Sequence, residues 1–281
     1  MSKKAGRKKS DKAAVNRTHI EEDSALVQEC IQTLRELLQG EKNLKVRTDD
    51  KFMLRYLRWQ NFDPELAFSK LKEIYKFRAE TKEWHCNKPP CEYETIHSLN
   101  CQVMLGERDN RGRRVYVVKV GNVDMNNKAV TVEQLNHVDD MWLELMLEEE
   151  EVQKNGIAVI IDLAGYSWKM FRWLTPTNVR ISSRKLYNLS FPSISFHVVN
   201  TSFLLNASIA IVYPFLDSKI KEQIHFHNND WSSLHKHINP DILPAEYGGY
   251  LPGIDYEKLR RVLYDNTDVL MAQFSMGYVD E

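Results

Sequence analysis

The segment GIAVIID at 156–162 is an unbroken apolar run that ends in an aspartate. A strand with one solvent-facing side alternates apolar and polar residues, so an unbroken run indicates a strand covered on both faces. Strands of this kind occur in parallel sheets, whose connecting helices cover the two faces. The run therefore predicts an α/β fold.

Strand-like and helix-like segments alternate on both sides of this run. CQVML (101–105) and RRVYVVKV (113–120) are joined by the turn sequence DNRG, which predicts a hairpin. The other predicted elements are helices at 131–153, at 176–189, from 203 and after 252, and strands at 194–199 and 224–227. This order predicts a mainly parallel sheet flanked by helices.

Residues 24–95 have helical signals instead. Ser24 precedes an amphipathic segment that stops at Gly40, a second apolar-basic segment covers 49–60, and Pro64 opens a third. Pro89-Pro90 ends this section. We predict an N-terminal helical domain at 24–95 and an α/β domain at 96–281.

The first 23 residues are basic and contain almost no large apolar side chain. We predict a disordered basic tail at 1–23, because such a segment cannot bury enough surface to offset its ordering entropy. A solubilising role is the simplest interpretation, and a tether to an anionic membrane or a nuclear address is the alternative.

Charge and hydropathy restrict the class of protein. The 38 Lys and Arg residues against 39 Asp and Glu give a net charge of −1, which argues against a nucleic-acid binder. No apolar stretch is long enough to span a bilayer, no secretory signal is evident, and the four cysteines do not suggest a disulfide scaffold. We therefore expect a cytoplasmic protein.

Motifs of enzymes are missing from the sequence, which contains no GxGxxG, GxxxxGK[ST], GxSxG or HExxH. Asp162 ends the buried strand, where α/β enzymes place catalytic groups, but a carboxylate that accepts from the amides of the following turn is the simpler interpretation. We predict that the protein is not an enzyme and uses no cofactor.

Histidines form two HxH pairs, His225 with His227 and His235 with His237. Alternate strand positions place His225 and His227 on one face, where imidazoles can bind zinc. No acidic or cysteine ligand accompanies them, and the group His85, Cys86, Cys91 and His97 has unfamiliar spacing. We predict no metal site.

The segment FLLNASIAIVYPFL at 203–216 is dominated by large apolar residues but is too short to span a bilayer. It is either a core helix or a gate with one face on an apolar cavity and the other on a membrane. Lys219 and Lys221 follow it, which suits contact with anionic headgroups. Phe203 and Leu204 are the residues that we expect to meet the membrane.

Four segments, in this order, resemble the CRAL-TRIO (Sec14-like) lipid-binding family: FMLRYLRWQNFDPELAFSKLKEIYKFRAE, NGIAVIIDLAGYS, PFLDSKIKEQIHFHNN and DILPAEYGG. The resemblance covers about residues 24–265 and is greatest to the members that carry tocopherol and retinaldehyde. It implies a helical N-terminal annex, an α/β domain that encloses one hydrophobic ligand, and a movable gate helix.

The resemblance also implies which positions line the cavity. They are Val118, Asp139, Leu143, Ile161, Tyr166, Leu174, Leu186, Phe191, Leu205, Ile209 and Val212. Most are apolar, as a ligand of low polarity requires. Asp139 is the exception: it either faces solvent or binds a ligand hydroxyl, and the former is simpler because a buried lone carboxylate is costly.

Tocopherol and retinaldehyde carriers have a basic groove for phosphoinositide headgroups, and this chain matches it only in part. Lys219 corresponds to one member, whereas Gln60 and Gln223 are neutral. The basic pair that follows Phe-Pro in the family is replaced by SIS at 193–195. Phosphate recognition needs converging cations, so we expect weak headgroup binding, with Arg55 and Arg58 compensating only in part.

Three functions remain open on the sequence. The first is a carrier that binds one small hydrophobic ligand (a retinoid, tocopherol or similar isoprenoid) and moves it between membranes. The second is a phosphoinositide or phospholipid sensor that presents lipid to an enzyme. The third, an enzyme using Asp162 and a histidine, is disfavoured because no motif activates a nucleophile. For the carrier we expect a monomer with a lipid ligand and transient membrane contact.

Overall fold

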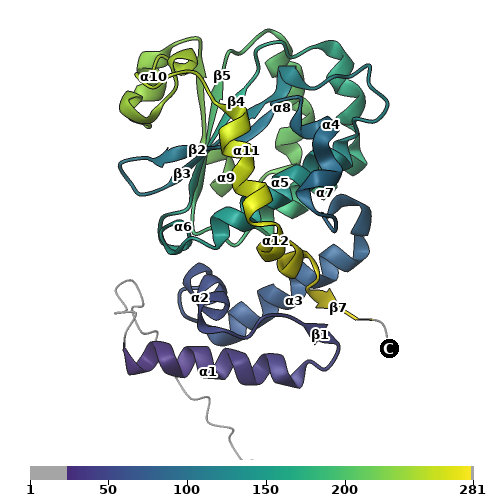
Figure 1. Ribbon diagram of the computed structural model, residues 1–281, viewed down its shortest axis with the longest axis vertical. Helices are drawn as coiled ribbons and strands as arrows, with labels where there is room; N and C mark the ends of the chain where they lie inside the picture. The colour runs from purple at the N-terminus through teal and green to yellow at the C-terminus, as the bar shows by residue number, and fades with distance from the viewer. Residues whose placement is uncertain (1–23, 280–281) are drawn as a thin grey trace, which may run out of the picture.

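A five-stranded sheet forms the centre of the protein, whose computed structural model describes residues 24–279 (Figure 1). The strands follow the order β2-β3-β4-β5-β6, with β3 to β6 parallel and β2 antiparallel at one edge. Their bounds are β2 Gln102–Arg108, β3 Arg114–Lys119, β4 Ile157–Asp162, β5 Ile194–Val199 and β6 Ile224–Asn228. The predicted α/β class, hairpin and mainly parallel sheet are confirmed.

Helices cover this sheet. The longer ones are α5 Val132–Leu147, α6 Glu150–Asn155, α7 Pro176–Tyr187, α8 Leu204–Val212, α11 Tyr256–Asp265 and α12 Thr267–Phe274. Shorter α-helical turns are α4 Glu94–His97, α9 Ser218–Glu222 and α10 Trp231–His235. The 3₁₀ turns are η2 Lys82–Trp84, η3 Pro90–Tyr93, η4 Val120–Asn122, η5 Trp168–Trp173, η6 Tyr213–Phe215, η7 Pro240–Ile242 and η8 Ala245–Tyr247. Within residues 24–279 no helix has the length and apolar character that crossing a bilayer requires.

The single helix predicted over 131–153 is wrong, because the chain leaves the helix between α5 and α6. Glu149 has an extended backbone (φ −90°, ψ 124°). Its carboxylate pairs with Arg108 and Arg114 of the β2–β3 hairpin. The Gln153 amide donates to the carbonyl of Leu147 at 2.7 Å, so this carbonyl at the C-terminal end of α5 has a hydrogen-bond partner. Contacts distant in sequence therefore override the local helical pattern.

The N-terminal helices form a second core below the sheet in Figure 1. They are α1 Ala25–Gly40, α2 Asp50–Trp59 and α3 Pro64–Glu80. Ser24, the predicted start of α1, caps its helix by accepting from a backbone N–H group, and Asp49 and Asp63 cap α2 and α3 in the same way. The predicted basic tail at 1–23 lies outside the described residues.

The C-terminal segment returns to this N-terminal core, which the sequence did not predict. After Pro252 the chain forms two helices instead of one, α11 and α12, and ends in the short strand β7 Gly277–Tyr278. Strand β7 pairs antiparallel with β1 Leu44–Lys45. The sulfur of Met276 accepts hydrogen bonds from the Arg47 N–H and the Tyr75 hydroxyl.

A buried ion pair joins the N-terminal helices to α5. Arg55 on α2 is 5% exposed and donates to Glu144 of α5 at 2.6 Å and to the Ser190 hydroxyl at 2.6 Å. Arg58 on the same helix pairs with Glu150 and donates to the amide oxygen of Gln153. Both guanidinium groups are therefore engaged in holding the two parts of the fold together.

Candidate functional site

One face of the sheet presents a continuous row of side chains to a cavity. The strand register aligns Gln102 with Val118, Val118 with Ile161, Ile161 with Val198 and Val198 with Phe226 across all five strands. Because side chains alternate along a strand, aligned residues share one face. All five line the cavity, and four of them are apolar.

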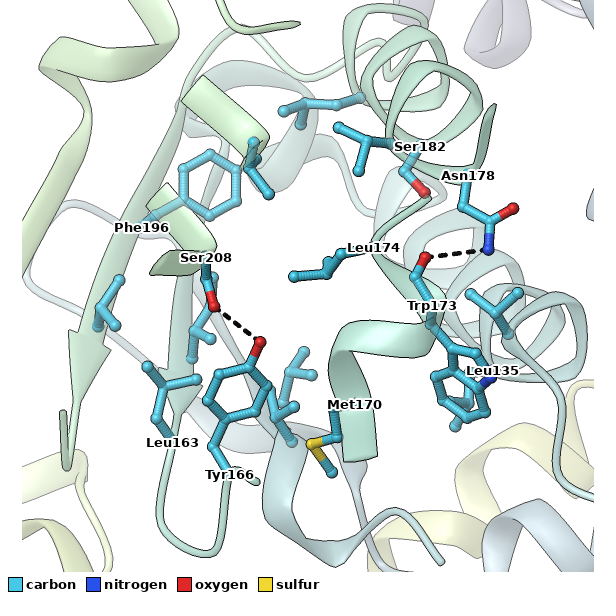
Figure 2. A pocket seen from close by; sticks show the side chains of 18 of the residues that line it. Leu135, Leu163, Tyr166, Met170, Trp173, Leu174, Asn178, Ser182, Phe196 and Ser208 are labelled. Atoms are coloured by element: carbon cyan, nitrogen blue, oxygen red, sulfur yellow. Dashed lines mark hydrogen bonds between the residues drawn. The ribbon is translucent and has the colours of Figure 1, made fainter. Parts of the chain in front are cut away.

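Helices α5, α7 and α8 and the turn η5 close the cavity on the side opposite this row. Its volume is about 510 Å³, within the usual size of small-molecule sites. Leu174 reaches toward its middle, while Met170, Trp173 and Phe196 stand around its wall (Figure 2). The cavity is thus an apolar chamber between the sheet and a cover of helices.

Nine of the eleven sequence-predicted positions lie together on this wall. They are Val118, Asp139, Ile161, Tyr166, Leu174, Leu186, Leu205, Ile209 and Val212. Leu143 and Phe191 are not lining residues and pack instead in the main hydrophobic core. Leu143 lies one helical turn beyond Asp139, and Phe191 precedes β5, so both fall toward the N-terminal ends of the parallel strands. Most of the strand residues that line the cavity lie nearer the other ends.

Asp139 faces inward, which corrects the expectation that it faces solvent. Its Oδ1 accepts hydrogen bonds from the Tyr116 hydroxyl and the Gln102 amide, each at 2.7 Å. Burial raises the pKa of this carboxyl to about 6, opposed by the hydrogen bond from Tyr116. Two donors from the sheet therefore offset part of the free-energy cost of burying the carboxylate. The sequence pattern of α5 could not predict these donors, because they lie on other elements.

Two hydrogen bonds organise the wall near the apolar segment 203–216. The Tyr166 and Ser208 hydroxyls meet at 2.7 Å, joining the loop before η5 to α8 (Figure 2). The Asn178 amide donates to the carbonyl of Trp173 at 3.0 Å, joining α7 to η5. The Tyr166–Ser208 hydrogen bond is therefore a polar contact that holds α8 to its neighbours among apolar ones.

The outer side of this region carries exposed aromatic rings. Phe203 is 78% exposed and Trp168 is 59% exposed, and their ring centroids lie 6.2 Å apart. Leu204 is only 4% exposed in this conformation, so its predicted contact with a membrane would require α8 to move. Trp168 was missed, although the aromatic-rich sequence WKMFRW was a signal for it.

Cations close to α8 are few. Lys219 is exposed, and Lys221 lies 5.7 Å from the ring centroid of Tyr213. Arg55 and Arg58, which were expected to compensate in part for the neutral groove positions, are occupied by Glu144 and Glu150. Lys219 and Lys221 are therefore available to meet an anionic surface beside α8, and the exposed Lys169 follows Trp168 on the same side.

Asp162 has the structural role that the sequence favoured. Its Oδ1 accepts from the Ala164 N–H at 2.9 Å and the Asn200 amide at 2.8 Å, and its Oδ2 accepts from the Tyr247 hydroxyl at 3.1 Å. These bonds fix the turn after β4 and attach the segment that contains η8. Asp162 thus joins β4 to two other segments of the framework.

Four histidines stack on the sheet face opposite the cavity. Ring centroids of His225 and His237 lie 4.4 Å apart, and those of His197 and His227 lie 5.2 Å apart. His197 Nδ1 and His227 Nε2 are 3.0 Å apart, and His227 Nδ1 lies 2.8 Å from the hydroxyl of Ser233. Within residues 24–279 no group of three His, Cys, Asp or Glu side chains is arranged to hold a metal ion.

Acidification is expected to destabilise the fold through buried histidines. Burial lowers the pKa of His97 to about 4 and, together with neighbouring imidazoles, that of His197 to about 2 and of His227 to about 4, from 6.5 in the unfolded chain. The unfolded state therefore binds more protons below pH 6.5, so stability falls as pH drops from 6.5 toward 4. Each group contributes on the order of 2 kcal/mol between pH 7 and pH 5.

Urea unfolding at pH 7 and pH 5 measures this effect. Asp139 has a raised pKa, so its protonation stabilises the fold as the pH falls. This single group opposes the three histidines and offsets only part of their effect. Equal free energies of unfolding at the two pH values would show that the histidines are not held neutral.

Comparisons with known proteins are consistent along the chain. The family model described as the CRAL/TRIO domain matches residues 98–249, and the model described as a Pinta-like UBA domain matches residues 23–95. Clavesin-1 of Xenopus laevis is 31% identical over 252 residues, covering 88% of this chain and 75% of that protein. Clavesin-2 of Homo sapiens is 30% identical over 257 residues, covering 89% and 77%.

A solved structure has a similar fold. The crystal structure of Sfh5 superposes with a TM-score of 0.58 and 15% sequence identity, covering 85% of this chain and 92% of that chain. At this identity the similarity concerns the fold alone.

Proposed function

Because the chain belongs to the CRAL/TRIO domain family, we propose that it is a carrier that binds one small hydrophobic lipid in its cavity and transfers it between membranes. The ligand class is a retinoid, a tocopherol or a similar isoprenoid. The carrier is cytoplasmic and monomeric and touches membranes only during transfer. The observation that carries this proposal is the apolar cavity of about 510 Å³ between the sheet and helices α5, α7 and α8.

The cavity supports this proposal through its energetics. Burying roughly 400 Å² of apolar ligand surface at ~25 cal/mol/Å² gives about 10 kcal/mol before the costs of association. The single basic residue among the described lining residues, Lys119, is paired with Glu246. A phosphate headgroup would find no free cation inside, so a lipid without phosphate fits this wall better than a phospholipid.

A lipid extract of the purified protein, analysed by mass spectrometry, tests the proposal. We expect one isoprenoid or similar neutral lipid, enriched over the host membranes in about equimolar ratio to the protein. Recovery of phosphoinositide or phospholipid instead would favour a sensor that presents lipid to an enzyme. Protein that carries no lipid and takes up none from liposomes would contradict the carrier function.

The segment 203–216 is the proposed gate. Its inner residues Leu205, Ile209 and Val212 line the cavity, while Phe203 projects outward beside Trp168. Helix α8 is linked to the loop before η5 through the Tyr166–Ser208 hydrogen bond, a weak enough restraint to break when the rings enter a membrane. Opening is expected on the microsecond-to-millisecond scale of lids.

Replacing the outer rings should slow ligand transfer. Phe203→Asp and Trp168→Asp each remove about 1–2 kcal/mol of apolar insertion from the membrane encounter, so each should lower the transfer rate to liposomes about 5- to 30-fold. Ligand affinity should change little, because neither ring is needed to seal the inner wall. The measurement is transfer rate against liposome concentration.

Tyr250→Asp is the matched control for these variants, since Tyr250 is 76% exposed and is not a lining residue of the cavity. It should transfer ligand at the wild-type rate. If all three variants transfer equally fast with unchanged melting temperatures, α8 and η5 do not form the membrane-facing side.

Soluble phosphoinositide headgroups should bind weakly. Lys219 and Lys221 stand beside the neutral side chain of Gln223, and the guanidinium groups of Arg55 and Arg58 are paired within the protein. Two cations give at most a modest charge-assisted contact, so we expect dissociation constants near or above ~1 mM. A calorimetric titration with inositol phosphates that gave micromolar affinity would overturn this expectation and favour the sensor.

A further inference from the structure

Asp139 is the only acidic residue on the described wall of the cavity. It lies on α5, one turn after Leu135, and is half-buried because part of its surface faces the cavity. In an otherwise apolar chamber, a carboxylate is the group that most strongly orients a ligand, because its charge-assisted hydrogen bonds are stronger than those of neutral groups.

The two oxygens of this carboxylate differ in their surroundings. Oδ1 accepts from the Tyr116 hydroxyl and the Gln102 amide, and the Gln102 amide is itself fixed because it also donates to the carbonyl of Leu135 at 2.9 Å. Oδ2 accepts no hydrogen bond from any residue in 24–279, and it is not among the fully buried unpaired atoms. One oxygen is therefore held in place while the other is left for a ligand.

No cation in residues 24–279 forms an ion pair with Asp139, although the charge of Lys185 favours its ionised form. The neighbouring Asp140 forms its own ion pair with Lys185 of α7 at 2.9 Å, and Lys119 is paired with Glu246. Burial raises the pKa of the Cys101 thiol to about 12, so this lining residue remains neutral. With its own pKa at about 6, Asp139 is ionised at pH 8 and can only accept hydrogen bonds.

We propose that the cavity selects a hydrophobic molecule with a terminal hydroxyl group, whose O–H donates to Oδ2 of Asp139. This inference rests on the proposed carrier function and specifies the class of its ligand. An aldehyde or ester has only acceptor oxygens and leaves Oδ2 unpaired. A fatty-acid anion brings a second negative charge next to the first and is repelled.

Displacement of bound Nile red by three probes with a sixteen-carbon chain tests the selection at pH 8. The probes are hexadecan-1-ol, methyl hexadecanoate and hexadecanoic acid. The alcohol should displace the dye at about 10- to 100-fold lower concentration than the other two, the value of a charge-assisted hydrogen bond in a site without water. In the Asp139→Asn variant the displacing concentrations of the three probes should agree within about threefold, because an amide both donates and accepts hydrogen bonds.

Two further variants test whether the preference depends on Asp139 itself. Arg180→Ala changes an exposed residue of α7 that does not line the cavity and keeps Asp139, so its preference for the alcohol should equal that of the wild type. Tyr116→Phe removes a donor to Oδ1, which raises the pKa of Asp139, so the alcohol preference should disappear at a higher pH than in the wild type.

The outcomes distinguish this inference from the carrier function. Equal displacement by the three probes in the wild type, or an unchanged alcohol preference in a folded Asp139→Asn variant, would overturn the inference alone. If none of the probes displaces the dye, the inference is wrong; if the protein also takes up no lipid from liposomes, the carrier function is wrong as well.

Discussion

Ile161→Asp and Leu186→Asp should each abolish ligand retention. Ile161 lies in the middle of the row that crosses the sheet, and Leu186 contributes to the facing wall from α7. A carboxylate at either position would lie unpaired against an apolar ligand, at a cost of several kcal/mol. Since 1.4 kcal/mol is a tenfold change, we expect affinity to fall more than about 100-fold. Binding of a fluorescent hydrophobic ligand measures the loss.

Arg180→Asp is the matched control for Leu186→Asp, because Arg180 is exposed on the same helix and is not a lining residue. It should bind ligand as tightly as the wild type. Ile161 and Leu186 lie on different elements, so a folding defect in the Ile161→Asp variant still leaves the Leu186→Asp variant informative. Wild-type affinity in both, with melting temperatures unchanged, would show that the ligand is not held at this wall.

Arg55→Met should lower the free energy of unfolding by about 3–5 kcal/mol, the usual cost of leaving one partner of a buried ion pair alone. Glu144 would then lose the guanidinium at 2.6 Å, and the Ser190 hydroxyl would lose its donor. Because Arg55 is on α2 and Glu144 is on α5, the loss weakens the contact between the two cores of the protein. Urea unfolding gives the free energy.

The double variant Arg55→Met with Glu144→Met should recover most of this loss, since no buried charge is then left unpaired. Arg261→Met is the surface control: Arg261 pairs with Glu257 at 2.8 Å, but their side chains are 72% and 80% exposed. We expect it to cost less than about 0.5 kcal/mol. A loss below 1 kcal/mol in Arg55→Met would mean that the Arg55–Glu144 pair contributes little to joining the two cores.

Strands and their face were predictable because their signals are local. The unbroken run at 157–162 and the alternation at 194–199 follow directly from which sides of a strand are covered. The alternation of IHFH also predicts the orientation of Phe226, which was missed. Because His225 and His227 share one face of the strand, Phe226 points to the other, where it lines the cavity.

Features that depend on partners distant in the sequence were not predictable. The break after α5 depends on Arg108 and Arg114, which approach Glu149 from the hairpin. The inward orientation of Asp139 depends on two hydrogen-bond donors from the sheet, Tyr116 on β3 and Gln102 on β2. Helical periodicity predicts which residues share a face of the helix, but it cannot predict whether the sheet presents a hydrogen-bond donor to that face.

The pairing of β7 with β1 has a consequence for synthesis on the ribosome. Arg47 and Met276, which are hydrogen-bonded at this junction, are 229 positions apart, so the contact can form only after the whole α/β domain between them has been synthesised. The first helices are made early, but the strand that pairs with β1 and the hydrogen-bond partner of Tyr75 follow more than 200 residues later. Nascent chains usually fold their N-terminal part first, so we expect the N-terminal helices to fold initially without β7 and to gain its contacts only after the α/β domain is made.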